Sequence, residues 1–221
     1  MICTLWESGP IEPVQRDIFY NHGLTESLQG MIMEKRSTGI SGLDQVLEGG
    51  LPCGTIVLIQ GNPLSGSDLL ARQFWNAAAD FGTYLMLDGE VESGMLSEFS
   101  PERTEEYGRG EVIIVDSLST ILLEHGIDIT LAFLRSMKEQ IRRTGGNLIV
   151  LTYPGLHTQL EEVRLLRAVD LFFEMQQEVV MNEVSHLLII HKVVGMPVPL
   201  RVFPYFVTEH GVELSTSIFI V

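Results

Sequence analysis

The sequence predicts an α/β domain with a mainly parallel central sheet flanked by helices, followed by an antiparallel extension. From Thr38 onward, short apolar runs alternate with segments whose apolar residues recur at helical spacing, the pattern of strand–helix–strand units. Runs such as Val112–Val115 and Leu148–Leu151 are continuously apolar, as expected for strands buried on both faces. Beyond about residue 175 the helical spacing ends and short runs with turn residues follow, which favours antiparallel strands.

The elements follow in order along the chain. Residues 1–36 are expected to form an N-terminal arm or short helix, because apolar residues between Leu24 and Ile32 recur at helical spacing. Residues 37–221 form the domain. Its parallel strands are expected at 55–60, 83–87, 111–115, 147–152 and 170–174, its helices at 69–80, 92–99, 128–144 and 159–168, and its later antiparallel strands at 185–192 and 202–207.

Composition excludes several classes of protein. The chain has 221 residues, 45% of them hydrophobic, with no apolar run long enough for a membrane helix. Its formal charge of −15, from 29 acidic and 14 basic residues, argues against direct nucleic-acid binding, which requires a basic face. Two cysteines cannot form a disulfide framework, and no secretory signal opens the chain. We therefore expect a cytoplasmic protein without membrane contact.

The segment Gly61-Asn62-Pro63-Leu64-Ser65-Gly66-Ser67-Asp68 is the most informative for function. It has the two glycines of the phosphate-binding pattern G-x-x-x-x-G-K-[ST], between an apolar strand and a helical pattern. Ser67 stands in the position of the phosphate-binding lysine, and Asp68 in that of the magnesium-binding hydroxyl. Two unit charges about 4 Å apart interact by roughly 4 kcal/mol at an effective dielectric of about 20. The sequence therefore predicts a degenerate loop that has lost several kcal/mol of phosphate affinity.

The segments before this loop carry a resemblance to a known family. Thr38-Gly-Ile-Ser-Gly-Leu-Asp44 and Gly49-Gly-Leu-Pro-Cys-Gly54 precede the first strand and the loop. This order and spacing resemble the KaiC-like branch of the RecA superfamily, and the resemblance extends over about residues 38–215. It implies a RecA-like P-loop NTPase fold with a C-terminal antiparallel extension.

The resemblance also assigns roles to single residues. Asp116, after the run Glu111–Val115, resembles the Walker B aspartate; the alternative is a cap for the next helix. Asp88 and Glu90 stand where the family has adjacent catalytic glutamates and are identified as a vestigial catalytic carboxylate. Lys192 resembles the first residue of the trans-acting K-x-R finger, but Val194 replaces the arginine. The segment between Glu90 and Asp116 is shorter than in typical relatives, which implies a trimmed helix.

These departures predict a non-hydrolysing KaiC/RecA-like homologue, a pseudo-ATPase acting as a regulatory or scaffolding protein-interaction module with no catalytic residue. One alternative is a weak or altered nucleotide-binding protein that uses Asp68 and Asp116 with a metal. A further alternative is a recombination accessory protein. No cofactor is expected, with ATP or ADP and Mg²⁺ only in the first alternative. The six histidines show no metal-ligand spacing.

The expected partner is another protein or a second copy of the chain. Ser217–Val221 is almost wholly apolar, and a terminus is normally polar unless something holds it. It either completes its own domain as a last strand or contacts a second subunit or protein partner. The charge of −15 disfavours a long filament, so we expect a small oligomer or a heteromeric complex.

Overall fold

The computed structural model describes residues 34–180 and 182–215. The expected N-terminal arm, apart from 34–36, and the apolar segment Ser217–Val221 lie outside these described residues. None of the described helices is both long enough and apolar enough to cross a membrane.

From β3 onward the described residues mostly follow the alternation of strands and helices that the sequence predicted, with β1, α1, β2 and β10 as elements that it did not predict. The strands are β1 (Lys35–Arg36), β2 (Leu51–Pro52), β3 (Ile56–Gly61), β4 (Phe81–Met86), β5 (Val112–Asp116), β6 (Asn147–Thr152), β7 (Leu171–Val180), β8 (Glu183–Lys192), β9 (Phe203–Thr208) and β10 (Gly211–Leu214). The helices are α1 (Ser41–Val46), α2 (Ser67–Asn76), η1 (Pro101–Arg103), α3 (Thr104–Tyr107), α4 (Leu118–Thr144) and α5 (Gln159–Ala168).

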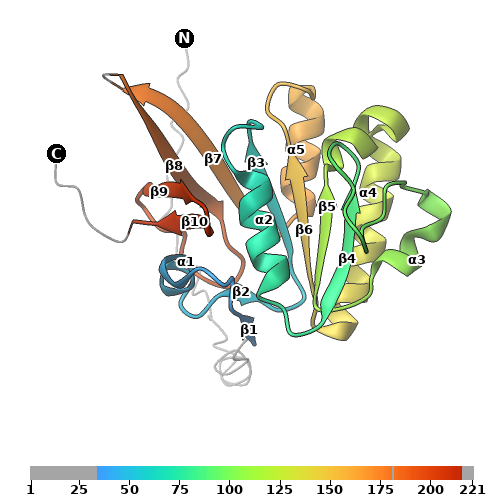
Figure 1. Cartoon of the computed structure of the whole chain (residues 1–221). Helices are drawn as coiled ribbons and strands as arrows, with labels where there is room; N and C mark the ends of the chain where they lie inside the picture. Colours follow the sequence, from blue (N-terminus) through green and yellow to red (C-terminus); the bar gives the residue numbers. More distant parts are fainter. Residues whose placement is uncertain (1–33, 181, 216–221) are drawn as a thin grey trace, which may run out of the picture. The chain divides into compact units, whose positions relative to one another are not determined.

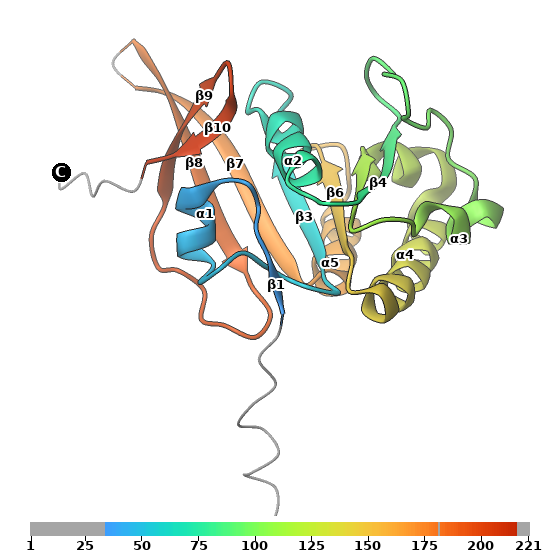
Figure 2. The same ribbon diagram turned by 60° about the horizontal axis from the view of Figure 1, so that its bottom comes forward.

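Eight strands form one sheet in the order β10-β9-β8-β7-β3-β6-β5-β4. Strands β7, β3, β6, β5 and β4 pair in parallel, whereas β7 to β10 pair in antiparallel fashion. Helix α2 covers one face of the sheet, and α4 and α5 cover the other (Figure 1). Figure 2 shows α1 on the α2 side, over the antiparallel strands. The predicted fold class is confirmed.

Strand β3 divides two hydrophobic cores, because successive side chains of a strand point to opposite faces. Val57 and Ile59 pack in the core that contains Phe74 of α2. Ile56 and Leu58 pack in the other core, which contains residues of α4 and α5. All four β3 side chains are at most 2% exposed, as the continuously apolar run predicted for a strand covered on both faces.

The expected helix at 92–99 is wrong. Gly94 has a positive φ of 93°, a backbone conformation outside the right-handed helix. The backbone of Leu96 instead pairs with the edge strand β4, accepting from Met86 N–H at 2.8 Å and donating to Tyr84 O at 2.9 Å. Edge pairing therefore outweighs helical spacing here, and the only described helical elements between β4 and β5 are η1 and α3.

Helix α4 begins at Leu118, well before the expected start at residue 128. Ser117 caps it by accepting a hydrogen bond from Thr120 N–H at 3.3 Å. Gly126, with φ 78° and ψ 166°, interrupts the helical backbone, so the sequence pattern correctly identified only the part after this kink. The cap is Ser117, and the alternative role of Asp116 as a helix cap is wrong.

The segment Thr38–Asp44 forms a turn that is held together by hydrogen bonds to the Asp44 carboxylate. Asp44 Oδ1 accepts from Thr38 N–H at 2.7 Å and from the Thr38 hydroxyl at 2.6 Å, and its Oδ2 accepts from Ser37 Oγ at 2.5 Å. Gly39 adopts a positive φ of 77° between them, and a Cβ there would approach Ala77 Cβ to 2.9 Å. The threonine, glycine and aspartate of this motif are thus explained by a tight turn packed on the end of α2.

Replacing Asp44 is expected to destabilise the fold. Asp44→Ala removes three hydrogen bonds to a carboxylate and leaves the buried Thr38 hydroxyl with a weaker set of partners. Because one hydrogen bond to a charged group contributes about 1.5–3 kcal/mol, we expect a loss of about 2–3 kcal/mol in the free energy of unfolding, measured by urea denaturation. Gln45→Ala, at the next and exposed position, is the control and should change stability by less than about 0.5 kcal/mol. Equal stability of the two variants would contradict this account.

Candidate functional site

An acidic cleft of about 280 Å³ lies where β3, β4 and β5 end, beside the N-terminus of α2. Ligands of open α/β sheets bind outside the carboxyl ends of parallel strands, so this is the position expected for a site. One guanidinium, that of Arg72, lines the cleft. Five carboxylates line it as well: Asp68, Asp88, Glu90, Glu92 and Asp116.

The loop Gly61–Asp68 joins β3 to α2, as the sequence predicted. Gly66 has a positive φ of 77°, and a Cβ at Gly61 would collide with Ser65 Oγ. Both glycines are therefore required by the backbone path of the loop. The spacing of the two glycines is therefore explained by the conformation of the loop and does not by itself indicate a ligand.

Two backbone donors of the loop are used within the loop itself. Leu64 N–H donates to Asn62 Oδ1 at 2.8 Å, and Ser65 N–H donates to Asn62 O at 3.0 Å. On its other side, Tyr205 of β9 donates its hydroxyl to Ser65 O at 2.7 Å. In working phosphate loops the backbone N–H groups face the phosphates, so this loop offers fewer donors to an anion.

The single cation of the cleft is paired. Arg72 Nη1 donates to Glu92 Oε1 at 2.7 Å, and its guanidinium lies 5.7 Å from the centre of the Tyr84 ring. Ser67 is buried with 4% exposure, and Asp68 is exposed at the cleft. The electrostatic field of the cleft is therefore negative, the opposite of what a nucleotide phosphate needs.

Asp116 lies at the C-terminal end of β5, as predicted, and is 3% exposed. Burial raises the pKa of its carboxyl to about 6, with further contributions from nearby Asp68 and Asp88, while the hydrogen bond from Tyr84 opposes the shift. The Tyr84 hydroxyl donates to Asp116 Oδ2 at 3.3 Å. The pKa of Tyr153 at the same cleft is raised to about 12, mainly by burial.

Asp88 is held by two hydroxyl groups from the first turn of α4. Ser117 Oγ donates to Asp88 Oδ2, and Thr120 Oγ1 donates to Asp88 Oδ1. Glu90 lies further along the exposed rim of the cleft. A general base needs a free lone pair directed at its substrate, and both Asp88 oxygens are already acceptors.

Lys192 lies at the end of β8 and is not among the residues that line the acidic cleft. Its Nζ donates to Leu166 O at 2.9 Å and to Val169 O, so it binds the carbonyls at the C-terminal end of α5. Burial lowers the pKa of Lys192. Within this chain Lys192, which was predicted to correspond to a vestigial trans-acting finger, stabilises the C-terminal end of α5.

Sequence reasoning missed four residues that shape the cleft: Arg72, Tyr84, Ser117 and Thr120. Ser117 could have been found, because a serine directly between an apolar strand and a helix is an N-cap signal. Arg72 and Tyr84 belong to an ordinary helical face and an ordinary strand, and only the packing of α2 on β4 brings them together.

The donor set fits Mg²⁺ and a triphosphate poorly. Among the described residues, no group of three or more histidine, cysteine, aspartate or glutamate side chains could hold a metal ion. Magnesium sites in nucleotide-binding proteins combine one or two carboxylates with substrate phosphates. Here the loop contributes no cation to those phosphates, because positions 67 and 68 are Ser and Asp.

Comparison with known proteins shows which family and which solved fold this chain resembles. Residues 36–87 match the model of the family described as "ATPase: KaiC". The solved structure of the KaiC-like protein PH0186 from Pyrococcus horikoshii OT3 superposes with a TM-score of 0.69, covering 83% of this chain and 99% of that one at 16% identity. The chain therefore has the fold of that KaiC-like protein. The family match covers the segment that contains the loop Gly61–Asp68.

Curated relatives match this chain over a short segment. A UPF0273 protein of Thermotoga maritima is 38% identical over 60 residues, which are 26% of this chain and 25% of that protein. A UPF0273 protein of Methanopyrus kandleri is 42% identical over 52 residues, 24% of this chain and 21% of that protein. The aligned segment thus spans about a quarter of each relative's length.

The raised pKa of Asp116 predicts a pH-dependent stability difference. The folded-state pKa of about 6 exceeds the unfolded value of about 3.9, so folding favours the protonated acid and stability is lost as pH rises between these values. Asp116→Asn keeps an acceptor for Tyr84 and cannot ionise. We expect it to be more stable than the wild type by about 2 kcal/mol at pH 7, and the difference to vanish below about pH 4.

Urea denaturation at a series of pH values measures this difference. Asp80→Asn, an exposed aspartate outside the cleft, is the matched control and should follow the wild-type curve. A destabilised Asp116→Asn at pH 7 would show that the ionised carboxylate has a stabilising partner.

Proposed function

We propose that this chain is a non-hydrolysing KaiC-like protein that acts as a regulatory or scaffolding module through contacts with other proteins. The observation that carries the proposal is the reversed charge of the cleft. Five carboxylates face one guanidinium, which is itself paired with Glu92, at the place where relatives with the intact pattern carry a lysine.

The contacts of Asp88 and Lys192, the residues that correspond to catalytic positions of the family, support the same proposal. Asp88, predicted to be a vestigial catalytic carboxylate, accepts hydrogen bonds from two hydroxyl groups at the start of α4, and Lys192 binds carbonyls at the end of α5. Catalysis by positioned groups tolerates little displacement. Asp88 and Lys192 each have hydrogen-bond partners within the fold, so either side chain could act in catalysis only after these hydrogen bonds were broken.

A second function, altered nucleotide binding through Asp68, Asp116 and a metal, has one supporting observation. Both carboxylates line the same cleft, and carboxylates suit Mg²⁺. Against it stand the negative field of the five carboxylates around the cleft and the serine at position 67 in place of the phosphate-binding lysine. The described residues offer no specific support for the recombination alternative.

Exposed apolar side chains support the protein-contact part of the proposal. Leu64, in the phosphate-loop segment, is 75% exposed. At the end of the β7–β8 hairpin, Val179 and Val184 face each other across the strands and are 74% and 54% exposed. Figure 1 shows this hairpin extending beyond the neighbouring strands. Exposed apolar groups at such projecting places are typical of interaction surfaces.

Nucleotides are expected to leave the stability of the wild-type chain unchanged. A ligand present at 100 times its dissociation constant adds about 2.7 kcal/mol to stability, so binding would be visible as a shift in melting temperature with ATP–Mg²⁺ or ADP–Mg²⁺. The double variant Ser67→Lys/Asp68→Thr restores the loop pattern and is expected to gain a nucleotide-dependent shift. Asp68→Asn, which removes the carboxylate without adding a cation, is the control and should show little gain.

ATP turnover in the wild type at an ordinary rate, abolished by Asp116→Ala, would refute the pseudo-ATPase proposal. A melting shift of the wild type that requires Mg²⁺ and is lost in Asp68→Asn would instead favour the altered nucleotide site.

Association through the loop surface gives an independent test. We expect the full chain to have a mass above the 24.7 kDa of one copy in light scattering, or to be captured on a heteromeric partner. Leu64→Ser should weaken that association by about tenfold, because it removes an exposed leucine from the contact. Leu200→Ser, at a fully exposed leucine elsewhere, is the control. Equal association of both variants would exclude the loop surface.

A further inference from the structure

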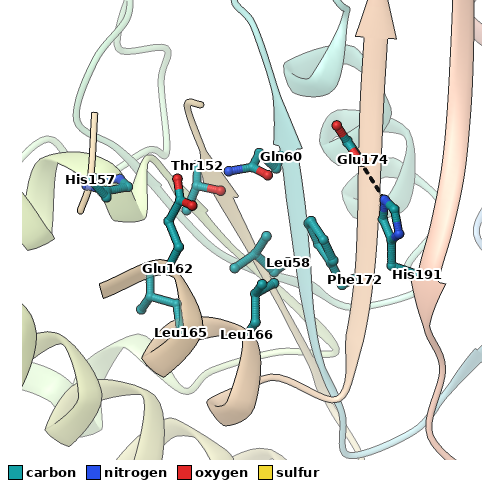
Figure 3. A pocket seen from close by; sticks show the side chains of 10 residues that line it. All are labelled: Leu58, Gln60, Thr152, His157, Glu162, Leu165, Leu166, Phe172, Glu174 and His191. Atoms are coloured by element: carbon teal, nitrogen blue, oxygen red, sulfur yellow. Dashed lines mark hydrogen bonds and ion pairs between the residues drawn. The ribbon is translucent and has the colours of Figure 1, made fainter. Parts of the chain in front are cut away.

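A second cavity, of about 140 Å³, lies on the opposite face of the sheet from α2, between α5 and strands β3, β6 and β7. Figure 3 shows its lining side chains. Leu58, Leu165, Leu166 and Phe172 form its apolar part. The acidic cleft described above shares none of the residues that line it.

Two polar atoms of this cavity are buried without a hydrogen-bond partner. They are Thr152 Oγ1 and His157 Nδ1, and Thr152 is only 2% exposed. Both side chains line the cavity, on the side away from the Phe172 ring (Figure 3). Buried polar atoms in folded proteins nearly always have a partner, so two such atoms lining one cavity indicate a missing bound group.

The neighbours of His157 determine which ring nitrogen carries its proton. Ser119 Oγ accepts from Tyr153 N–H at 3.0 Å and lies 2.8 Å from His157 Nε2. Since Ser119 Oγ already accepts one hydrogen bond, we assign its hydroxyl proton to the bond with Nε2, and in this assignment the neutral ring carries its proton on Nδ1. Burial lowers the pKa of His157, which favours this neutral form. The cavity consequently presents an N–H donor from His157 and a hydroxyl from Thr152.

The charges around the cavity select against anions. Glu162 directs its carboxylate toward the Thr152 side (Figure 3). Glu174 Oε2 lies 2.6 Å from His191 Nε2, and the His191 ring stacks on Phe172 with centroids 4.9 Å apart. The described residues that line the cavity include no lysine or arginine. A bound carboxylate or phosphate would therefore lose its hydration and meet two acidic side chains.

The volume sets the size of the bound group. A cavity of about 150 Å³ lined by apolar side chains holds one benzene molecule, so about 140 Å³ accommodates a single ring. The apolar part suits the ring faces, and the polar side suits an edge that carries both an acceptor and a donor.

We propose that this cavity binds a single-ring nitrogen heterocycle, uncharged or cationic, which accepts from His157 Nδ1–H and donates to Thr152 Oγ1 or to Glu162. This inference goes beyond the proposed function and does not depend on it, because it concerns a different cavity and requires no nucleotide.

The test uses the full chain and 2-aminopyrimidine, whose ring nitrogen and amino group place an acceptor beside a donor. Benzoate, an anion of similar size, and benzene, which lacks a polar edge, are the comparison probes. We expect saturable binding of 2-aminopyrimidine by calorimetry or ligand-observed NMR, at least about tenfold tighter than that of either comparison probe.

Thr152→Val keeps the side-chain shape and removes the hydroxyl. We expect it to weaken 2-aminopyrimidine binding about tenfold, while the melting temperature of the free chain stays unchanged or rises because an unsatisfied buried hydroxyl is removed. His157→Ala, in the loop before α5, is the second variant and should weaken binding similarly. Thr208→Val is the matched control: its hydroxyl bonds to Gly211 O at 3.1 Å, so binding should persist while stability falls.

Three results would overturn the proposal. One is the lack of saturable binding of 2-aminopyrimidine at its solubility limit, which would mean that the cavity holds water alone. The second is binding that Thr152→Val and His157→Ala leave unchanged. The third is benzoate or benzene binding as tightly as 2-aminopyrimidine, which would show that the polar edge does not select the ligand.

Discussion

The parallel pairing of β3 with both β6 and β7 is the constraint on which the rest of the structure depends. The register sets Gln60 opposite Thr152 on one side and Glu174 on the other, so β3 and β6 end together while β7 continues to Val180. The phosphate-loop segment and the loop before α5 therefore start side by side, next to the continuing strand β7. The second cavity depends directly on this arrangement, because Gln60, Thr152 and Glu174 all line it.

In and near the acidic cleft, most of the charged groups discussed above have partners within the domain. Asp88 accepts from two hydroxyls of α4, Arg72 pairs with Glu92, and Lys192 binds the end of α5. Asp116 differs from them, because burial raises the pKa of its carboxyl and its ionised form therefore costs stability.

The sequence predicted the elements whose signals are local and got wrong those decided by packing. The parallel strands were predicted from apolar runs and α5 from helical spacing, and both were correct apart from β7, which continues to Val180 beyond the expected end at 174. The short strands β1, β2 and β10 were not predicted. The apolar residues of segment 92–99 recur at helical spacing, which predicted a helix. The backbone of Leu96 in this segment instead forms hydrogen bonds to β4, and a pairing with an edge strand distant in sequence leaves no local pattern. The loop residues 61–68 and Asp116 were placed correctly because glycine spacing and strand ends are local features. Arg72 and Tyr84 meet only after α2 has packed on the sheet, so no pattern in the sequence indicates them.

The fold and the charge of the cleft rest on different physical terms. The fold depends on buried apolar side chains of β3, β5 and β6 and on the Asp44 network, whereas the charge of the cleft comes from side chains at its rim such as the exposed Asp68. The loop path depends on Gly61 and Gly66, which remain. A charged side chain at the mouth of a cleft contributes to ligand binding and little to the core. The segment 36–87 can therefore match the family model, with both loop glycines in place, while positions 67 and 68 carry Ser and Asp.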